Sequence, residues 1–178
     1  MVKMAVRPLS KITTKVLALL SLWLSFCAVP QARAGTANDD FIAGLSAFNS
    51  GDFHIAMLLW LPWAEKSDPR AEQGVGFMYH RGLAVDLDDV KAAYWFRRAA
   101  EHGQAEGQLM LGALYFFGEG VPQSNIDAFA WCDLAQSNGQ NDASMCRDAA
   151  LGAMSTAEEM RSAFALSVKV RDLYGPRH

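Results

Sequence analysis

The chain has 178 residues, a net charge of −3 at pH 7 and three cysteines. This length allows one domain with a hydrophobic core after removal of a targeting segment. The mature chain defined below is acidic and has no basic stripe, so nucleic acid is excluded as the expected partner.

Residues 1–34 have the layout of a secretory signal peptide. A basic start is followed by an apolar stretch over residues 16–29 and by Ala-Arg-Ala at residues 32–34. We therefore expect cleavage near Ala34 and a periplasmic or secreted protein. Residues 1–34 carry five of the sixteen basic residues and no acidic ones, so eleven basic and nineteen acidic residues remain, a net charge of −8.

Two other interpretations of this segment are less consistent with its residues. The apolar stretch is shorter than the run of about 20 residues that spans a bilayer, which argues against a retained anchor. Cys27 could carry a lipid, but Phe26 precedes it, where a small residue is expected. Contact with a membrane is therefore expected only through a partner.

A repeat with a period of 36 residues follows. The residue pairs that match at this spacing are Gly76/Gly112, Tyr79/Tyr115, Gly82/Gly118, Val85/Val121, Ala92/Ala128, Trp95/Trp131, Ala99/Ala135 and Gly103/Gly139. Each unit predicts two helices joined by a loop, each helix ending at a glycine. A third copy begins at Gly44 and has a loop four residues shorter.

These patterns predict an all-α protein, an α-solenoid of stacked helical hairpins with closing C-terminal helices. One hairpin cannot bury its apolar face alone, whereas about three stacked hairpins form a continuous core. We expect hairpins at about 41–69, 70–104 and 105–140 within a repeat domain of residues 35–143, and closing helices and a tail at 141–178. In the tail, Ser155 and Glu158 fit a capping box that starts the last helix.

Residues 41–143 resemble Sel1-like repeats. The resemblance rests on "GFMYHRGLAVDLDDVKAAYWFRRAAEHGQAE" from residue 76 and "GALYFFGEGVPQSNIDAFAWCDLAQSNGQND" from residue 112. This family is related to tetratricopeptide repeats and has a longer loop within each hairpin. The resemblance implies a protein that binds other proteins.

Catalytic and metal-binding patterns are sparse. The sequence has no nucleophile elbow, phosphate-binding loop or dinucleotide fingerprint, and its histidines have no Cys, Asp or Glu at metal-ligand spacing. Asp86, Asp88 and Asp89 are interpreted as a solvated loop with one helix cap rather than a cation site. His102, at a predicted helix end, is interpreted as a favourable cation against the helix dipole. We therefore predict no enzyme activity, catalytic residue, metal or cofactor.

Cys132 and Cys146 are the cysteines that remain after cleavage. An oxidising compartment favours a disulfide between them, but both also occupy core positions, so two buried thiols are the alternative. Some exported Sel1-like proteins have a disulfide in each repeat, and the cysteines here do not match that pattern.

The expected binding surface is the concave face that the first helix of each hairpin lines in tetratricopeptide-type stacks. A row of exposed side chains is expected there: Phe48, Phe77, His80, Arg81, Phe116 and Phe117. Aromatic rings beside a guanidinium suit an extended peptide or a partner helix. The alternative is that some of these phenylalanines pack against the tail helices.

The function predicted from the sequence is a non-enzymatic protein-interaction module of the bacterial cell envelope, with a protein or peptide partner. The alternative is a secreted hydrolase or penicillin-binding enzyme, because some Sel1-like proteins have been proposed to act on such compounds. The Ser-x-x-Lys motif of those enzymes is absent from this sequence. Self-association through the exposed ends of the repeat array is a third possibility.

Overall fold

The computed structural model describes residues 35–176. The described residues from Thr36 on belong to one compact unit. The predicted signal peptide lies outside the described residues.

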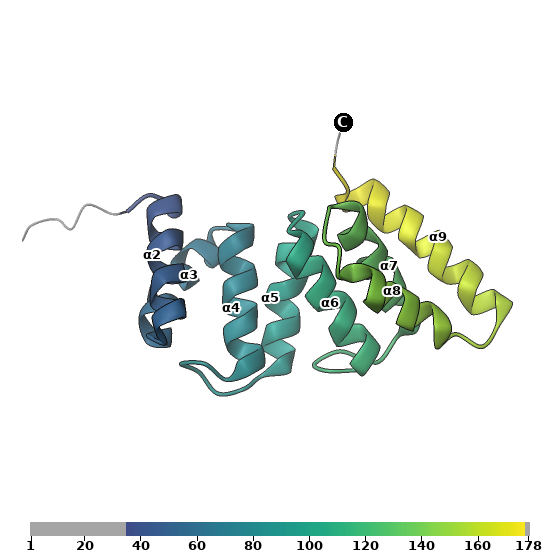
Figure 1. Ribbon diagram of the computed structural model, residues 1–178, viewed down its shortest axis with the longest axis horizontal. Coiled ribbons are helices and arrows are strands. Elements are labelled where there is room, and N and C mark those ends of the chain that lie inside the picture. The colour runs from purple at the N-terminus through teal and green to yellow at the C-terminus, as the bar shows by residue number, and fades with distance from the viewer. Residues whose placement is uncertain (1–34, 177–178) are drawn as a thin grey trace, which may run out of the picture. The chain divides into compact units, whose positions relative to one another are not determined.

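Within this range the chain forms eight helices and no strand. Figure 1 shows how they are arranged. The helices are α2 (Ala37–Ser50), α3 (Phe53–Glu65), α4 (Pro69–Arg81), α5 (Asp89–Glu101), α6 (Ala105–Phe117), α7 (Asn125–Ser137), α8 (Ala143–Gly152) and α9 (Ala157–Tyr174). The predicted all-α class is confirmed.

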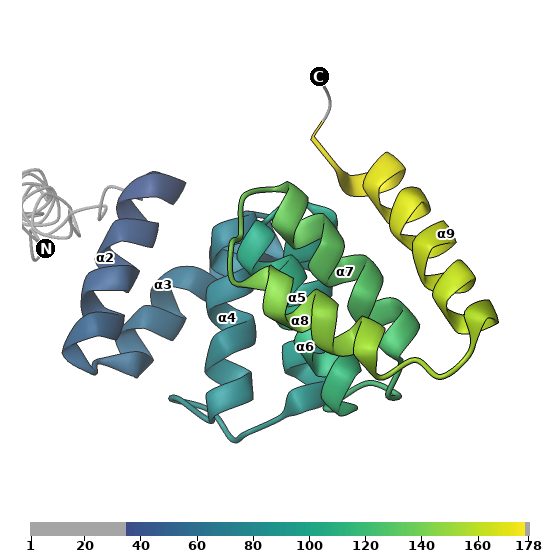
Figure 2. The same cartoon turned by 45° about the vertical axis from the view of Figure 1, so that its right-hand side comes forward.

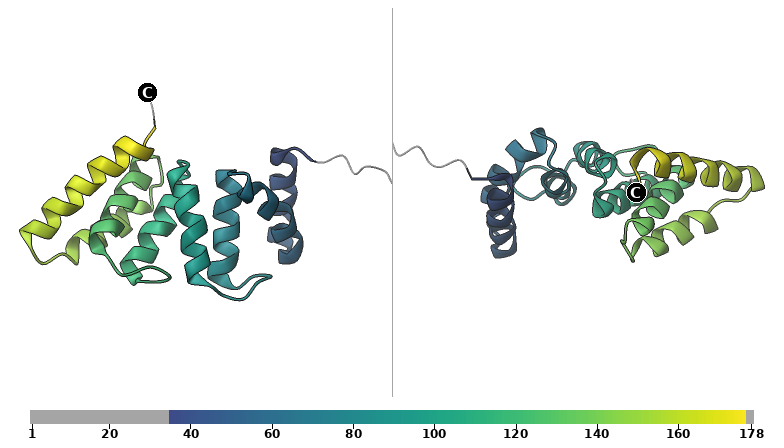
Figure 3. Two further views of the ribbon diagram at one scale, coloured as in Figure 1. Left: turned by 180° about the vertical axis from the view of Figure 1, so that it is seen from behind. Right: turned by 90° about the horizontal axis from the view of Figure 1, so that it is seen from above.

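The helices from α2 to α7 pack in chain order, each against the one before and the one after it. Figure 1 and the view from behind in Figure 3 show them side by side. The paired helices α2–α3, α4–α5 and α6–α7 form three antiparallel hairpins. This sequential packing is the arrangement of an α-solenoid, in which each hairpin covers the apolar face of its neighbour.

A glycine in the first helix of each hairpin lets the second helix approach closely. A methyl group on Gly76 would lie 2.8 Å from the ring of Phe96, and Gly112 faces Cys132 in the same way. Gly44 faces Trp60 sixteen residues later, whereas the other two pairs are twenty residues apart. The four-residue difference is the shorter loop expected for the first unit.

The alanines at the repeat positions of the second helices are fully buried. Ala56, Ala92 and Ala128 each have no exposed surface. A larger side chain at any of them would force two packed helices apart, which costs about 1–3 kcal/mol in a well-packed core. The small residues of the repeat thus set the helix spacing.

The two closing helices both pack against α7, and α9 lies apart from α8, as Figure 2 shows. Asp133 of α7 holds α9 by accepting hydrogen bonds from Ser167 and Arg171. The apolar side chains of α9 that are buried in the core are Ala163 and Val170. The end of the repeat array is therefore covered by a helix that does not continue the hairpin pattern.

The predicted cap of α9 is wrong by one residue. Thr156, not Ser155, is the N-cap, and its hydroxyl accepts from the Glu159 backbone N–H at 3.1 Å. Glu159, rather than Glu158, accepts from the backbone of both Thr156 and Ser155 at 2.9 Å. Both registers fit the capping-box pattern, and the register observed gives one carboxylate two N–H donors. The hydrogen bond from the Thr156 backbone, the largest contribution, lowers the pKa of Glu159.

A disulfide joins Cys132 of α7 to Cys146 of α8. Their Cα atoms are 6.0 Å apart, which is within the normal range for a disulfide. Of the two alternatives left by the sequence, the structure contains the bridge. It ties the third hairpin to the first closing helix.

We expect reduction of this bridge to lower the free energy of unfolding by about 3 kcal/mol, because the cross-link closes a loop of about 15 residues in the unfolded chain. Denaturant unfolding of the exported protein with and without reductant measures the difference. The Cys132→Ala/Cys146→Ala variant is the control, and its stability should not change with reductant. Alkylation of both thiols in the native, unreduced protein would contradict the bridge.

Candidate partner-binding groove

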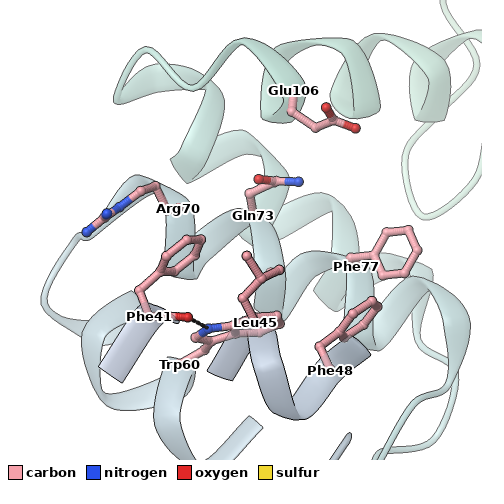
Figure 4. A pocket seen from close by; sticks show the side chains of 9 residues that line it. Phe41, Leu45, Phe48, Trp60, Arg70, Gln73, Phe77 and Glu106 are labelled. Carbon is pink, nitrogen blue, oxygen red and sulfur yellow. Dashed lines mark hydrogen bonds between the residues drawn. The ribbon is translucent and has the colours of Figure 1, made fainter. Parts of the chain in front are cut away.

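An apolar pocket lies between α2 and α4, with Trp60 of α3 and Glu106 of α6 also in its lining. Its volume is about 210 Å³, and Figure 4 shows the side chains that line it. The lining residues, which we call the groove, are Phe41, Leu45, Phe48, Trp60, Arg70, Gln73, Gly74, Phe77 and Glu106. Three first helices of consecutive hairpins contribute to it.

Helical spacing places the α2 residues of the groove on one face. Phe41, Leu45 and Phe48 are separated by four and three residues, the spacing of a single helix face. Gly44 and Ala47 lie on the face that is buried against α3. Helix α2 therefore uses its small residues for packing and turns its large apolar residues toward the groove.

Trp60 of α3 reaches the groove because two glycines leave room for its ring. A methyl group on Gly74 of α4 would lie 2.7 Å from the indole, and one on Gly44 of α2 would overlap it. The Trp60 indole N–H donates to the backbone carbonyl of Phe41 at 3.3 Å. The ring is only 4% exposed and forms a fixed floor.

The other aromatic rings pack on this floor and on one another. The ring centroids of Phe41 and Phe48 lie 5.9 and 5.7 Å from that of Trp60. Phe77 of α4 meets Phe48 of α2 edge to face at 5.7 Å. These separations are typical of favourable aromatic pairs, so the apolar walls hold each other in place.

The cation at the edge of the groove is neutralised locally. Arg70 lies over the ring of Phe41 at 4.6 Å and forms an ion pair with Asp68 at 3.0 Å. Burial by itself would raise the pKa of Asp68, but hydrogen bonds from the Arg70 side chain and from the Ala71 and Arg70 backbone outweigh it, and the pKa is lowered. Asp68 is therefore an anion at neutral pH and balances Arg70.

Glu106 is the anion of the groove. It lies in the first turn of α6, where the helix dipole stabilises a carboxylate. Among residues 35–176, no ion pair or side-chain hydrogen bond involves Glu106. With Arg70 paired to Asp68, the groove combines an apolar floor with one unpaired negative charge.

Two of the six side chains predicted for binding line the groove, and a third lies beside it. Phe48 and Phe77 are in its walls. Arg81 is exposed, and its guanidinium lies over Phe77 at 5.4 Å. The aromatic and guanidinium pairing expected from the sequence is thus present on α4.

His80 lies away from the groove, contrary to the predicted row. Its Nδ1 is 2.8 Å from a carboxylate oxygen of Asp89 at the start of α5, and its ring faces Phe96. Three residues turn a helix by about 300°, so His80 lies about 60° around α4 from Phe77. His80 therefore meets Asp89 and Phe96 of α5, whereas Phe77 packs on Phe48 of α2. The predicted row placed His80 and Arg81 on one face, although adjacent residues of a helix point about 100° apart.

Phe116 and Phe117 also do not continue the row. Phe116 is half-buried and packs against the apolar cluster of α7, α8 and α9. Phe117 is 66% exposed and contacts Phe116 edge to face at 5.1 Å. Packing against the tail helices therefore accounts for Phe116, as the alternative proposed, whereas Phe117 is not a core residue.

Most residues of the groove were absent from the predicted row, among them Trp60, Arg70 and Glu106. A tryptophan in the apolar run of residues 55–64 indicates packing in a core, so the sequence alone does not place Trp60 in a groove. Arg70 and Glu106 begin α4 and α6, where an acidic or basic side chain has no distinctive pattern. Their proximity to Phe41 and Phe77 depends on how the hairpins stack.

Among the described helices, none is both long enough and apolar enough to span a membrane.

The stacked hairpins and the groove on their first helices define the class of this molecule as a helical repeat protein of the α-solenoid type. Within that class it contains two Sel1 repeats, because residues 69–104 and 105–139 each match the Sel1 repeat model. Proteins built from Sel1 repeats typically mediate protein–protein interaction, and their fold is typically a non-catalytic scaffold.

Solved structures that are similar to this chain include the following two. One is a protective antigen present in uropathogenic Escherichia coli strains that displays an SLR fold, with a TM-score of 0.77 and 29% identity over 82% of this chain and 32% of the antigen. The other is a Sel1 repeat protein from Oxalobacter formigenes, with a TM-score of 0.58 and 27% identity over 75% of this chain and 97% of that protein. The chain thus spans about a third of the antigen's length.

Proposed function

We propose that this protein is a non-enzymatic interaction module of the bacterial cell envelope. Its groove binds a segment of a partner protein that carries one bulky apolar side chain and a basic residue beside it. The observation that carries the proposal is the combination, in one groove, of aromatic walls with the unpaired carboxylate of Glu106. The envelope location rests on the signal-peptide pattern of residues 1–34.

The size of the groove supports a peptide rather than a small molecule. Its volume of about 210 Å³ is below the range of about 300–1,000 Å³ that is usual for small-molecule sites. A partner segment needs only one anchor side chain in such a pocket and can continue along the surface. The rigid aromatic floor fits this mode, because binding then orders few side chains of the groove.

The charge of the groove selects the residue beside the anchor. Arg70 is already paired with Asp68, so an acidic partner residue would gain little from it. A lysine or arginine near Glu106 would form an ion pair at a partly shielded position, whereas an acidic residue there would be repelled. We therefore expect basic rather than acidic residues next to the anchor.

A displayed peptide library screened against the exported protein tests this proposal. Enriched peptides should contain a bulky apolar residue followed or preceded by Lys or Arg. Phe77→Ala should weaken binding of such a peptide by about 1–3 kcal/mol, the usual range for an anchor contact. Glu106→Gln should weaken it selectively for peptides that carry the basic residue.

Matched controls are available in the chain. Phe117→Ala removes an equally large aromatic side chain that is exposed outside the groove, and Glu65→Gln removes an exposed carboxylate at the end of α3. Both should leave peptide affinity unchanged. Equal binding by Phe77→Ala and the parent protein would refute the groove as the binding site. Enrichment of acidic peptides would refute the charge assignment.

A further inference from the structure

Three metal-ligand side chains meet on another part of the surface, at the junction of the second and third hairpins. They are His80 at the end of α4, Asp89 at the start of α5 and Glu119 in the loop after α6. One ligand atom from each lies within 4.8 Å of the other two. No metal site was expected from the sequence, because residues 80, 89 and 119 have no recognisable ligand spacing.

Stacking of the repeats creates this junction. Gly120 has a positive φ of 68°, and a methyl group there would overlap the backbone carbonyl of Asp89. The α6–α7 loop can therefore lie directly on the first turn of α5, which brings Glu119 to His80 and Asp89. The close approach of the two loops, rather than a local motif, positions the third ligand.

The cations nearest in sequence are engaged elsewhere. Lys91 forms an ion pair with Asp88 at 3.1 Å and lies over the ring of Tyr79. Arg81 lies over Phe77. In the described part of the chain, Asp89 has His80 as its ion-pair partner and Glu119 has none. The two carboxylates thus have one imidazole beside them, and neither has a lysine or arginine as its ion-pair partner.

The site is specific to this junction. One repeat later, Phe116 and Asn125 occupy the positions that correspond to His80 and Asp89, and one repeat earlier Leu83 corresponds to Glu119. The set is therefore not a by-product of the repeat consensus. The His80 and Asp89 side chains are 19% and 28% exposed, so the pair is partly shielded, whereas Glu119 is exposed.

We propose that His80, Asp89 and Glu119 bind a divalent transition-metal ion, with Zn²⁺ as the best match. One imidazole nitrogen and two carboxylate oxygens form a mixed donor set that suits Zn²⁺, with water in a fourth position. Mg²⁺ and Ca²⁺ prefer sites made only of oxygen. Zn²⁺ would bind Nδ1 in place of the His80–Asp89 hydrogen bond, with the imidazole proton at Nε2.

A bound ion would link α4, α5 and the next hairpin's loop, and so stiffen the junction of two repeats. Titration of the untagged exported protein with Zn²⁺ should show one ion per chain and a rise in melting temperature. His80→Ala should weaken binding by at least about tenfold, since even outer partners of metal ligands contribute about 10–100-fold.

Glu119→Gln is the second variant, because its exposed side chain can change without disturbing the fold. It should also weaken Zn²⁺ binding. His54→Ala, which removes an exposed histidine on α3, is the matched control and should bind Zn²⁺ as the parent does. Unchanged affinity in both His80→Ala and Glu119→Gln would overturn the proposal and leave the His80–Asp89 pair as a contact between two helices.

Discussion

Replacing Arg98 by Leu is expected to lower the free energy of unfolding by about 3–5 kcal/mol. Arg98 of α5 pairs with Glu72 of α4 at 2.9 Å, and Glu72 has no exposed surface. His102, at the end of α5, is 2.7 Å from the other carboxylate oxygen. Without Arg98, a buried carboxylate would retain only a histidine as its partner, which is the costly way to break a buried ion pair.

From the sequence, His102 was expected only to stabilise the end of a helix, as a cation against the helix dipole. It does cap the end of α5, but its main contact is Glu72 of the preceding helix. Arg98 also lies over the Trp95 ring at 5.0 Å and donates to Ser67. The cluster therefore fastens α5 to α4 and to the turn before α4.

The next hairpin contains a neutral version of the same cluster. Thirty-six residues after Glu72, Arg98 and His102 stand Gln108, Leu134 and Asn138. Gln108 is fully buried, accepts from Asn138 at 2.8 Å and donates to the Ala100 carbonyl. Repeat stacking thus tolerates either an ionic or an amide contact at this place.

This neutral cluster provides the control for Arg98→Leu. The triple variant Glu72→Gln/Arg98→Leu/His102→Asn copies it and should recover most of the lost stability, because neutral replacement of a buried ion pair is often harmless. Denaturant unfolding of the parent, single and triple variants measures both effects. If the single variant were as stable as the parent, Glu72 would not depend on Arg98 in the folded protein.

The repeat itself was predictable from sequence because it is a property of single positions. Gly76, Ala92 and their equivalents recur at a fixed spacing, and each needs only to be small for two helices to approach. The shorter first loop could also be derived, because Gly44 and Trp60 preserve the packing pair while their separation changes. Helix content and hairpin order follow from such local signals.

The site was less predictable, because it depends on helix rotation and on contacts between hairpins. Phe116 and Phe117 are adjacent and of one type, yet one packs on the tail helices and the other faces solvent. Glu106 and Glu119 acquire their surroundings only when the third hairpin stacks on the second. Sequence spacing within one helix contains no information on these distances.

The second large effect is expected at the floor of the groove. Trp60→Ala should lower the free energy of unfolding by about 3–5 kcal/mol, the usual range for removal of a buried aromatic side chain. Trp60 fills the space left by Gly44 and Gly74 and supports Phe41 and Phe48. Its removal would therefore weaken the first hairpin and the groove together.

The damage should be local, because each hairpin of a repeat protein depends mainly on its neighbours. Hydrogen exchange of Trp60→Ala should show lost protection in α2 and α3 and retained protection in α6 and α7, which the Cys132–Cys146 bridge ties to α8. Trp60→Phe copies Phe96 of the second hairpin and should keep most of the stability and of the peptide affinity. Leu58→Ala, at a side chain that is 73% exposed on the same helix, is the control and should change little. Retained protection of α2 and α3 in Trp60→Ala, with unchanged peptide binding, would show that the aromatic walls hold the groove without the indole floor.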